Sequence, residues 1–438
     1  MAISELTAQN TAPSIASLHA LDWVNFFVAA LLMGFGPFVA VHLANRSWSP
    51  ESIGLVLTVS GLSGLIAQIP AGELIDVVKS KRVLIGAGTA AAALALLLFG
   101  LRSDFPSIIT AALIQGLAGS MLGPAIAAIS LGLVGHDALA DRLGRNQRFA
   151  SIGGLAAAAV MGIIGYLLST RDIFVLCAAL WIPLLLALRR IRGTDIHFGR
   201  SCGAPDHHGT APQRASRTVL FKDHRLLTFA FCLFLFQLAN AALLPQLSQT
   251  LARAEGHLSS LIVSALVVGP QIVVALLAPR AGRMAASWGR RPLLVIGLAA
   301  LPIRSGLFAV TTDPTALVAL QLLDGVSGAT LGVLTALVVA DLTAGTGRFN
   351  LAQGLVGTLS GIGASLSTSL SGVIVQTFGN AAGFFGVTAV GLLAVAVVLA
   401  FMPETKPPSA AGPDTGRKTG TLNRPRSPAD LTRFRHRV

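Results

Sequence analysis

The chain has 438 residues, of which 53% are hydrophobic and only 12% are charged, against about 25% charged in a typical soluble domain. Long apolar runs recur along most of its length, and roughly 20 apolar residues span a hydrocarbon layer ~30 Å thick. These features exclude a soluble globular protein and predict an all-α polytopic membrane protein. We interpret the net charge of +13 as a signal of topology and lipid contact, so no nucleic-acid partner is expected.

The apolar runs form two sets of six, with polar sequence before, between and after them. They divide the chain into an N-terminal tail (1–19), an N-terminal half (20–189), a central loop (190–225), a C-terminal half (226–402) and a C-terminal tail (403–438). Membrane segments of the first half are predicted at 22–43, 53–72, 83–101, 107–134, 147–169 and 172–189. Those of the second half are predicted at 226–251, 258–279, 292–311, 315–340, 350–376 and 380–402.

The tails and loops indicate the topology. Residues 1–19 contain no Lys or Arg and no apolar core, so we interpret them as a cytoplasmic tail rather than a signal peptide. With the N-terminus inside, the outer loops hold only Arg46, Arg102, Arg171 and Arg253. Because basic residues gather on the cytoplasmic side, both termini are predicted to face the cytoplasm from the cell (inner) membrane. The basic, Pro-rich tail 403–438 is predicted to be disordered.

Two charged loops about 210 residues apart share a pattern of glycine followed by a basic pair. They read GELIDVVKSKR at 72–82 and GRMAASWGRR at 282–291. The repeat extends to the fourth and tenth segments, where QGLAGSMLG at 115–123 matches DGVSGATLG at 324–332. Such internal repeats predict two six-helix halves that enter the membrane in the same orientation.

The two loops resemble the loop between helices 2 and 3 of the major facilitator superfamily, Gly-x-Leu-x-Asp-Arg-x-Gly-Arg-Lys. The first loop keeps Gly72, Leu74 and Asp76. The second loop keeps Gly282, Gly289, Arg290 and Arg291. Val77, Lys79 and Ala286 depart from the family pattern. The resemblance covers residues 20–402 and implies two halves around a central cavity, with these loops as cytoplasmic gating loops.

Two charged residues lie deep within membrane segments, where each is costly and needs an explanation. Asp324 is ten residues into the tenth segment, about 15 Å along the helix, and its repeat partner is Gln115. The resemblance implies that the first, fourth, seventh and tenth helices line the cavity, so both residues are candidates for the substrate or proton pathway. Arg304, in the antiparallel ninth segment, comes to a similar depth. A structural salt bridge with Asp324 and an anion-binding role are both open.

Two amides occupy the middle of the seventh segment. Gln237 and Asn240 are three residues apart and therefore lie on one face of the helix. Amides in membrane helices bind either a substrate or a neighbouring helix. We predict that both line the pathway, with helix packing as the alternative.

The central loop contains a cluster of residue types that bind zinc. These are Asp195, His197, Cys202, Asp206, His207 and His208. Their spacing fits no recognised zinc template, so we interpret the stretch as a disordered linker, and no metal or cofactor is expected.

The resemblance implies a secondary active transporter of a small solute, and the chain has no ATP-binding loop. Proton coupling is expected from Asp324, and efflux is slightly favoured because the expected cavity is mainly apolar with a few amides. An enzyme is not expected, because the membrane segments offer almost no converging catalytic groups. A non-transporting receptor or a lipid-handling protein on the same scaffold remains an alternative. The expected partners are a small molecule, protons and membrane lipids, and the protein is expected to act as a monomer.

Overall fold

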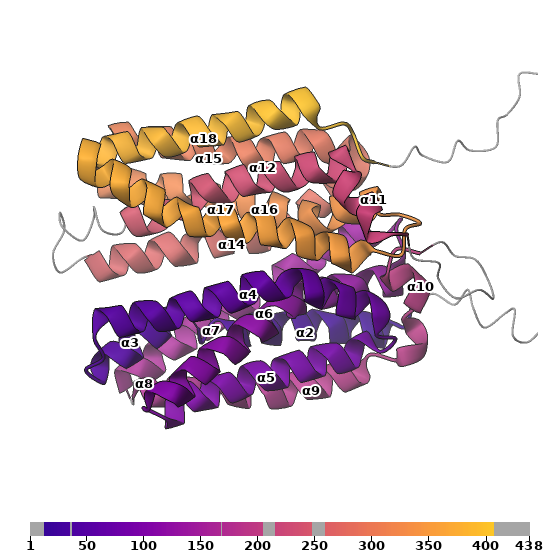
Figure 1. The fold of residues 1–438 in the computed structure, drawn as a ribbon, viewed down its shortest axis with the longest axis horizontal. Coiled ribbons are helices and arrows are strands. Elements are labelled where there is room, and N and C mark those ends of the chain that lie inside the picture. The colour runs from indigo at the N-terminus through magenta and orange to yellow at the C-terminus, as the bar shows by residue number, and fades with distance from the viewer. Residues whose placement is uncertain (1–12, 36, 168, 205–214, 248–258, 407–438) are drawn as a thin grey trace, which may run out of the picture. The chain divides into compact units, whose positions relative to one another are not determined.

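Long α-helices make up most of the chain in the computed structural model, which describes residues 13–35, 37–167, 169–204, 215–247 and 259–406 (Figure 1). The first half contains α2 (Ile15–Leu32), α3 (Pro37–Asn45), α4 (Pro50–Val77), α5 (Lys81–Leu101), α6 (Phe105–Val134), α7 (Leu139–Leu167), α8 (Thr170–Ala179) and α9 (Trp181–Arg190). The second half contains α12 (His224–Asn240), α14 (Ser259–Trp288), α15 (Arg290–Val310), α16 (Pro314–Leu342), α17 (Phe349–Phe378) and α18 (Asn380–Phe401).

Within the described residues, eleven helical stretches are long and apolar enough to cross a membrane. The long helix α7 occupies the place of the remaining predicted segment, the fifth. The described residues contain helices and no strand. The predicted all-α membrane fold is therefore confirmed.

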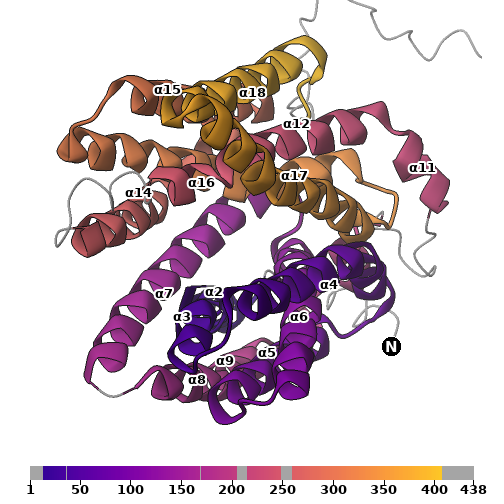
Figure 2. The ribbon, with the colours of Figure 1, turned by 60° about the vertical axis from the view of Figure 1, so that its left-hand side comes forward.

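The two halves repeat the same helix packing. Helix α4 packs on α6 as α14 packs on α16, and α2 packs on α7 as α12 packs on α17. Likewise α5 packs on α6 as α15 packs on α16. Between the halves, α4 contacts α17 and α7 contacts α14 (Figure 2). The sequence repeat therefore corresponds to a structural repeat.

Capping residues set the starts of several helices. Ser49, Asp104 and Asp313 each accept a main-chain hydrogen bond with the side chain at the start of α4, α6 and α16. A proline follows within two residues each time, where its fixed φ suits the first helical turn. These signals explain why the predicted starts of these segments agree with the structure to within a few residues.

The first helix differs from its predicted bounds of 22–43. It begins earlier, at Ile15, because the Ser14 hydroxyl accepts a hydrogen bond from the Ser17 N–H and caps the helix. It also ends at Leu32, and a separate helix, α3, starts at Pro37. Residues 15–19 of the predicted tail are therefore helical.

The described part of the central loop corrects the prediction of a disordered linker. It contains a 3₁₀ turn at Gly193–Asp195, α10 (Phe198–Ser201) and α11 (Arg217–Lys222), all at one end of the helices (Figure 1). The reason is close packing: Ser201 and Cys202 are buried, and α10 contacts α6. Asp206, His207 and His208 lie outside the described residues. We call this end of the bundle the central-loop end.

Candidate functional site: a cavity between the two halves

A cavity of about 620 Å³ lies between the halves. Residues of α2, α4, α6 and α7 line it from the first half, and residues of α12, α16 and α17 line it from the second. Most of these residues are apolar or glycine. The polar ones are Asn25, Gln68, Ser120, Asn146, Gln147, Gln237, Thr335, Gln353 and Ser360. Within the described chain, the lining includes no charged side chain.

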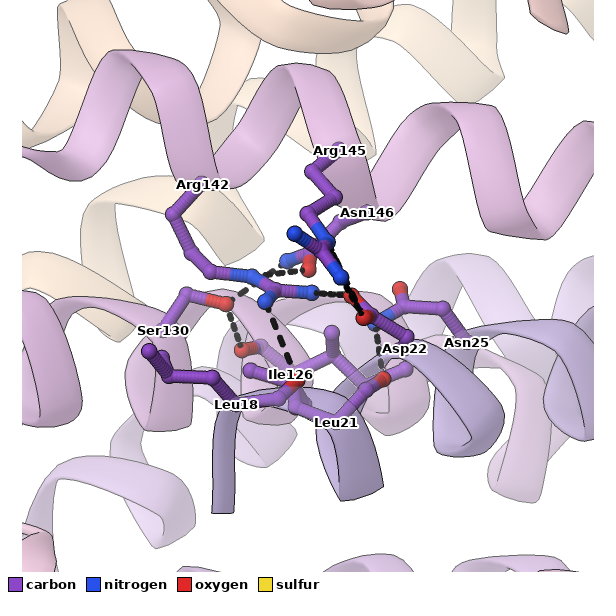
Figure 3. A network of polar contacts seen from close by, with 9 residues as sticks. All are labelled: Leu18, Leu21, Asp22, Asn25, Ile126, Ser130, Arg142, Arg145 and Asn146. Carbon is purple, nitrogen blue, oxygen red and sulfur yellow. Dashed lines mark hydrogen bonds and ion pairs between the residues drawn. The ribbon is translucent and has the colours of Figure 1, made fainter. Parts of the chain in front are cut away.

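A network of charged and polar side chains connects the middle of α2 with the start of α7 next to this cavity (Figure 3). The Asp22 carboxylate accepts hydrogen bonds from Arg142 at 2.5 Å and from Arg145 at 2.6 Å. Arg142 also donates to the Asn146 side-chain oxygen at 2.7 Å, and Asn146 donates to the Ser130 hydroxyl at 2.7 Å. Because Asn146 lines the cavity, the network holds one cavity amide in place.

The apolar pattern of the sequence does not point to this network, because Asp22 stands at the edge of a predicted segment. The available signal was Arg142 and Arg145, which are three apart and so share a helix face. Asp22 is 2% exposed and Arg142 is 5% exposed, and a buried charge needs a partner. Removing one member of a buried pair typically costs about 3–5 kcal/mol. We infer that the network fixes α7 against α2.

Arg304 and Asp324 form the ion pair that their depths in the sequence suggested. Arg304 Nη1 lies 2.7 Å from Asp324 Oδ1, and the Arg304 side chain is 2% exposed while that of Asp324 is 31% exposed. Arg304 also donates to the side-chain oxygens of Asn240 at 2.5 Å and of Gln321 at 3.3 Å. The guanidinium is therefore held by one carboxylate and two amides from α12 and α16.

The predicted pathway residues separate into two groups. Gln237 lines the cavity. Asn240 binds Arg304 instead, which is the helix-packing alternative. Gln115 accepts a hydrogen bond from Ser60 of α4 within the first half. Asp324, Arg304, Asn240 and Gln115 are not among the described residues that line the cavity.

Asp76 joins the halves at the central-loop end. Its buried carboxylate accepts hydrogen bonds from the main-chain N–H groups of Asn350 at 3.2 Å and Leu351 at 2.9 Å. It also accepts one from the Asn350 side chain at 2.8 Å. These are the first N–H groups of α17, where unpaired donors and the helix dipole favour an anion. Asp76 of α4 therefore caps α17 of the other half.

Glycines allow the same close helix crossing twice. A Cβ atom at Gly72 would overlap the main-chain oxygen of Asn350 at the start of α17. A Cβ atom at Gly282 of α14 would overlap the main-chain oxygen of Ala140 at the start of α7. The carboxylate of Asp76 accompanies only the first crossing, because Ala286 stands at the corresponding place in α14. Both helix crossings are therefore equally close, but only the crossing at Gly72 contains a buried carboxylate.

The basic end of the second charged loop (282–291) makes its polar contacts within its own half. Gly289 adopts a φ of 104°, and Arg290 donates to Asp341 at 2.9 Å and to the main-chain oxygen of Ala285 at 2.7 Å. Arg291 donates to the main-chain oxygen of Leu399 at 2.5 Å. These contacts tie the start of α15 to α14, α16 and α18.

Further polar contacts join the halves at the same end. Arg348 lies 3.6 Å from Glu73, and His136 of the α6–α7 turn lies 3.7 Å from Asp341. Hydrogen bonds and ion pairs between the halves therefore gather at the central-loop end. Within the described residues, no group of His, Cys, Asp and Glu is arranged to hold a metal ion.

Comparisons with known proteins agree with this architecture. A family model described as "Major Facilitator Superfamily" matches residues 21–229 and again residues 229–438. An "Uncharacterized MFS-type transporter" from Mycobacterium tuberculosis, found in strains CDC 1551 and H37Rv, is 35% identical over 389 residues. That match covers 88% of this chain and 93% of the relative.

Solved structures show the same fold. The proton:xylose symporter XylE, bound to 6-bromo-6-deoxy-D-glucose, superposes with a TM-score of 0.70 at 14% identity, covering 89% of this chain and 97% of XylE. The nucleoside transporter NupG superposes with a TM-score of 0.60 at 17% identity, covering 87% of this chain and 99% of NupG. At these identities the likeness concerns the fold.

Proposed function

Because the chain belongs to the major facilitator superfamily, we propose that it is a proton-coupled secondary transporter that exports a small uncharged solute by alternating access. The observation that carries this proposal is the cavity between the halves, together with the Asp76 cap that joins α4 to α17 at one end of it. Flux of solutes into and out of proteoliposomes under an imposed pH gradient tests it. A protein that binds solute without flux would instead be a receptor or a lipid-handling protein.

We infer that the protein works as a monomer in the cell (inner) membrane, with the central-loop end in the cytoplasm. The excess of Lys and Arg in the loops at this end supports that orientation. The conformation described is then the one closed to the cytoplasm, and Gly72 and Asp76 form its gate with the start of α17. The cycle would open this gate and close the opposite end.

The orientation predicts which surface positions react from each side of the membrane. Ser80 and Ser287 should be labelled from the cytoplasm, and Ser47 and Ser103 from outside, because all four are exposed and lie in loops or at helix ends of opposite sides. A membrane-impermeant thiol reagent applied to intact cells that carry single-cysteine variants measures this. Labelling of Ser80→Cys from outside would overturn the topology.

The lining of the cavity supports an uncharged solute with both apolar and hydrogen-bonding groups. Burying a charge without a partner is costly, whereas amides both donate and accept hydrogen bonds from neutral groups. The largely apolar remainder of the wall favours export of amphipathic compounds. A screen of export and uptake phenotypes in a deletion strain identifies the solute and the direction.

Gln237→Ala should weaken binding of that solute. Loss of one neutral hydrogen bond costs about 0.5–1.5 kcal/mol, which raises the half-saturating concentration roughly 2- to 12-fold. Initial flux rates over a range of solute concentrations measure it. Gln376→Ala is the matched control, because Gln376 is exposed near the end of α17. If the two variants had equal half-saturating concentrations, Gln237 would not contribute to solute binding.

Proton coupling is assigned to Asp324. It is an acidic side chain deep in α16, it is partly accessible, and it lies beside a buried cation. When Asp324 takes up a proton, its ion pair with Arg304 would open. Loss of the proton would close the pair again later in the cycle. Arg304 keeps two amide partners, Asn240 and Gln321, when Asp324 is protonated.

A further inference from the structure

Residues 193–204 of the central loop, which we call the strap, are fixed to the first half at two places. The Asp195 carboxylate accepts hydrogen bonds from the Ser14 hydroxyl at 2.6 Å and the Ser17 hydroxyl at 2.7 Å. Burial opposes the charge of Asp195, but these hydrogen bonds outweigh it and hold its pKa below the ordinary value. The anchor is therefore intact at neutral pH and is lost only as the pH falls through that lowered pKa.

The second anchor lies against α6. The His197 N–H donates to the main-chain oxygen of Gly132 at 3.0 Å. The Lys81 ammonium lies 4.8 Å from the centre of the Phe198 ring, a distance at which a cation is attracted to an aromatic face. These contacts attach α10 to the start of α5 and the end of α6.

The end of the strap binds the other half. The main-chain oxygen of Cys202 accepts a hydrogen bond from the Phe349 N–H at 3.1 Å, and that of Gly203 accepts one from the Gly347 N–H at 3.3 Å. The main-chain oxygen of Ser201 accepts one from the Asn350 side chain at 3.1 Å. All three donors belong to the turn before α17 or to its first residues. The strap thus contacts the same helix start that Asp76 caps.

Gly203 makes this contact possible. It adopts a φ of 72°, a left-handed conformation that other L-residues adopt only at a cost. A Cβ atom here would lie 3.2 Å from the Phe349 Cβ and 3.3 Å from the main-chain oxygen of Thr343. A larger residue at this position would therefore strain the strap and push it from the second half.

The corresponding segment after α18 does not cross between the halves. Glu404 accepts hydrogen bonds from the N–H groups of Arg290 at 2.8 Å and Arg291 at 3.0 Å, at the start of α15 in its own half. The crossing made by the strap is therefore not a consequence of the internal repeat. It is a contact specific to the central loop.

We propose that the strap is a latch: it is carried by the N-terminal half, closes on the start of α17, and must release Phe349, Gly347 and Asn350 before the cavity opens to the cytoplasm. The proposal rests on the alternating-access function above. It makes the central loop part of the gate rather than a passive connection. It also predicts that the thiol of Cys202 is exposed only when the latch is open.

Cys202 is a natural reporter of this event. Its side chain is 1% exposed, and its sulfur lies 3.2 Å from the main-chain oxygen of Asp76 and 3.5 Å from the Lys81 ammonium. Burial raises the pKa of the thiol, against the opposing effect of Lys81. The protonated, enclosed thiol should react slowly with alkylating reagents, because the thiolate is the reactive form.

The test measures the reaction rate of Cys202 with N-ethylmaleimide in the purified full-length chain. Cys177→Ala and Cys232→Ala, which replace two buried cysteines, leave Cys202 as the single thiol. Gly203→Ala should raise the rate about 5- to 30-fold, because the left-handed backbone disfavours alanine and shifts the latch toward its open form. Asp195→Asn weakens the anchor at Ser14 and Ser17 and should also raise the labelling rate of Cys202. This variant takes the place of Gly203→Ala in the test if Gly203→Ala does not fold.

Gly199→Ala is the matched control, because Gly199 also belongs to the strap and nothing lies within 4 Å of a Cβ atom there. Its labelling rate should equal that of the parent. The midpoint of thermal unfolding is measured alongside. Faster labelling at an unchanged midpoint supports the latch. Rates equal to the control, or a rise that appears only with a lowered midpoint, would overturn it. This labelling test does not measure flux. A negative result would therefore reject the latch without bearing on the proposed transport function, which the flux measurements test.

Discussion

Asp324→Asn is expected to reduce pH-driven transport to the level of empty proteoliposomes while solute exchange at equal pH continues. The asparagine side chain keeps the shape of the carboxyl group but cannot take up and release a proton. Arg304 would still have Asn240 and Gln321 as partners, so the helices should remain in place. Counterflow at equal pH and accumulation under a pH gradient, measured on the same proteoliposomes, separate coupling from movement of the solute.

The matched control is Asp313→Asn, an exposed carboxylate at the start of the same helix, which should keep pH-driven transport. Normal pH-driven transport by Asp324→Asn would refute the coupling role. Poor protein levels would point instead to a structural ion pair, since removing one member of a buried pair typically costs about 3–5 kcal/mol. In that case Arg304→Gln added to Asp324→Asn should restore the levels.

Asp76→Asn is expected to lower transport about ten- to hundredfold while expression stays near normal. The carboxylate accepts three hydrogen bonds from the start of α17. An asparagine would turn an N–H group toward at least one of these donors. A hydrogen bond to a charged group contributes about 1.5–3 kcal/mol, and each 1.4 kcal/mol changes a population tenfold. The conformation closed to the cytoplasm should therefore lose its preference, which slows the cycle.

Glu73→Gln is the matched control, because Glu73 is a second carboxylate near the end of α4. It tests whether the loss of any carboxylate there lowers flux as much as Asp76→Asn does. The Glu73 side chain is 27% exposed and pairs with Arg217 and Arg348, and exposed ion pairs contribute only about 0–1 kcal/mol. Its flux should fall less than about fivefold. Undiminished flux in Asp76→Asn, or equal losses in the two variants, would contradict the gating role of Asp76.

Sequence alone determined what depends on distance along a helix. Apolar runs of fixed length gave the membrane class, and the offset of about 210 residues gave the two halves. At 1.5 Å per residue, counting along two antiparallel segments placed Arg304 and Asp324 at similar depth, and their side chains do meet.

Only the tertiary structure decided what depends on rotation of a helix about its axis. A membrane helix is apolar toward lipid and toward its neighbours, so its sequence period does not show which side faces the cavity. Gln237 faces it while Asn240, three residues on, binds Arg304. The Asp22–Arg142 contact and the strap depend on residues more than 100 positions apart. Gly132 lets the strap lie close to α6, because a Cβ atom there would come within 2.9 Å of the Ile196 side chain.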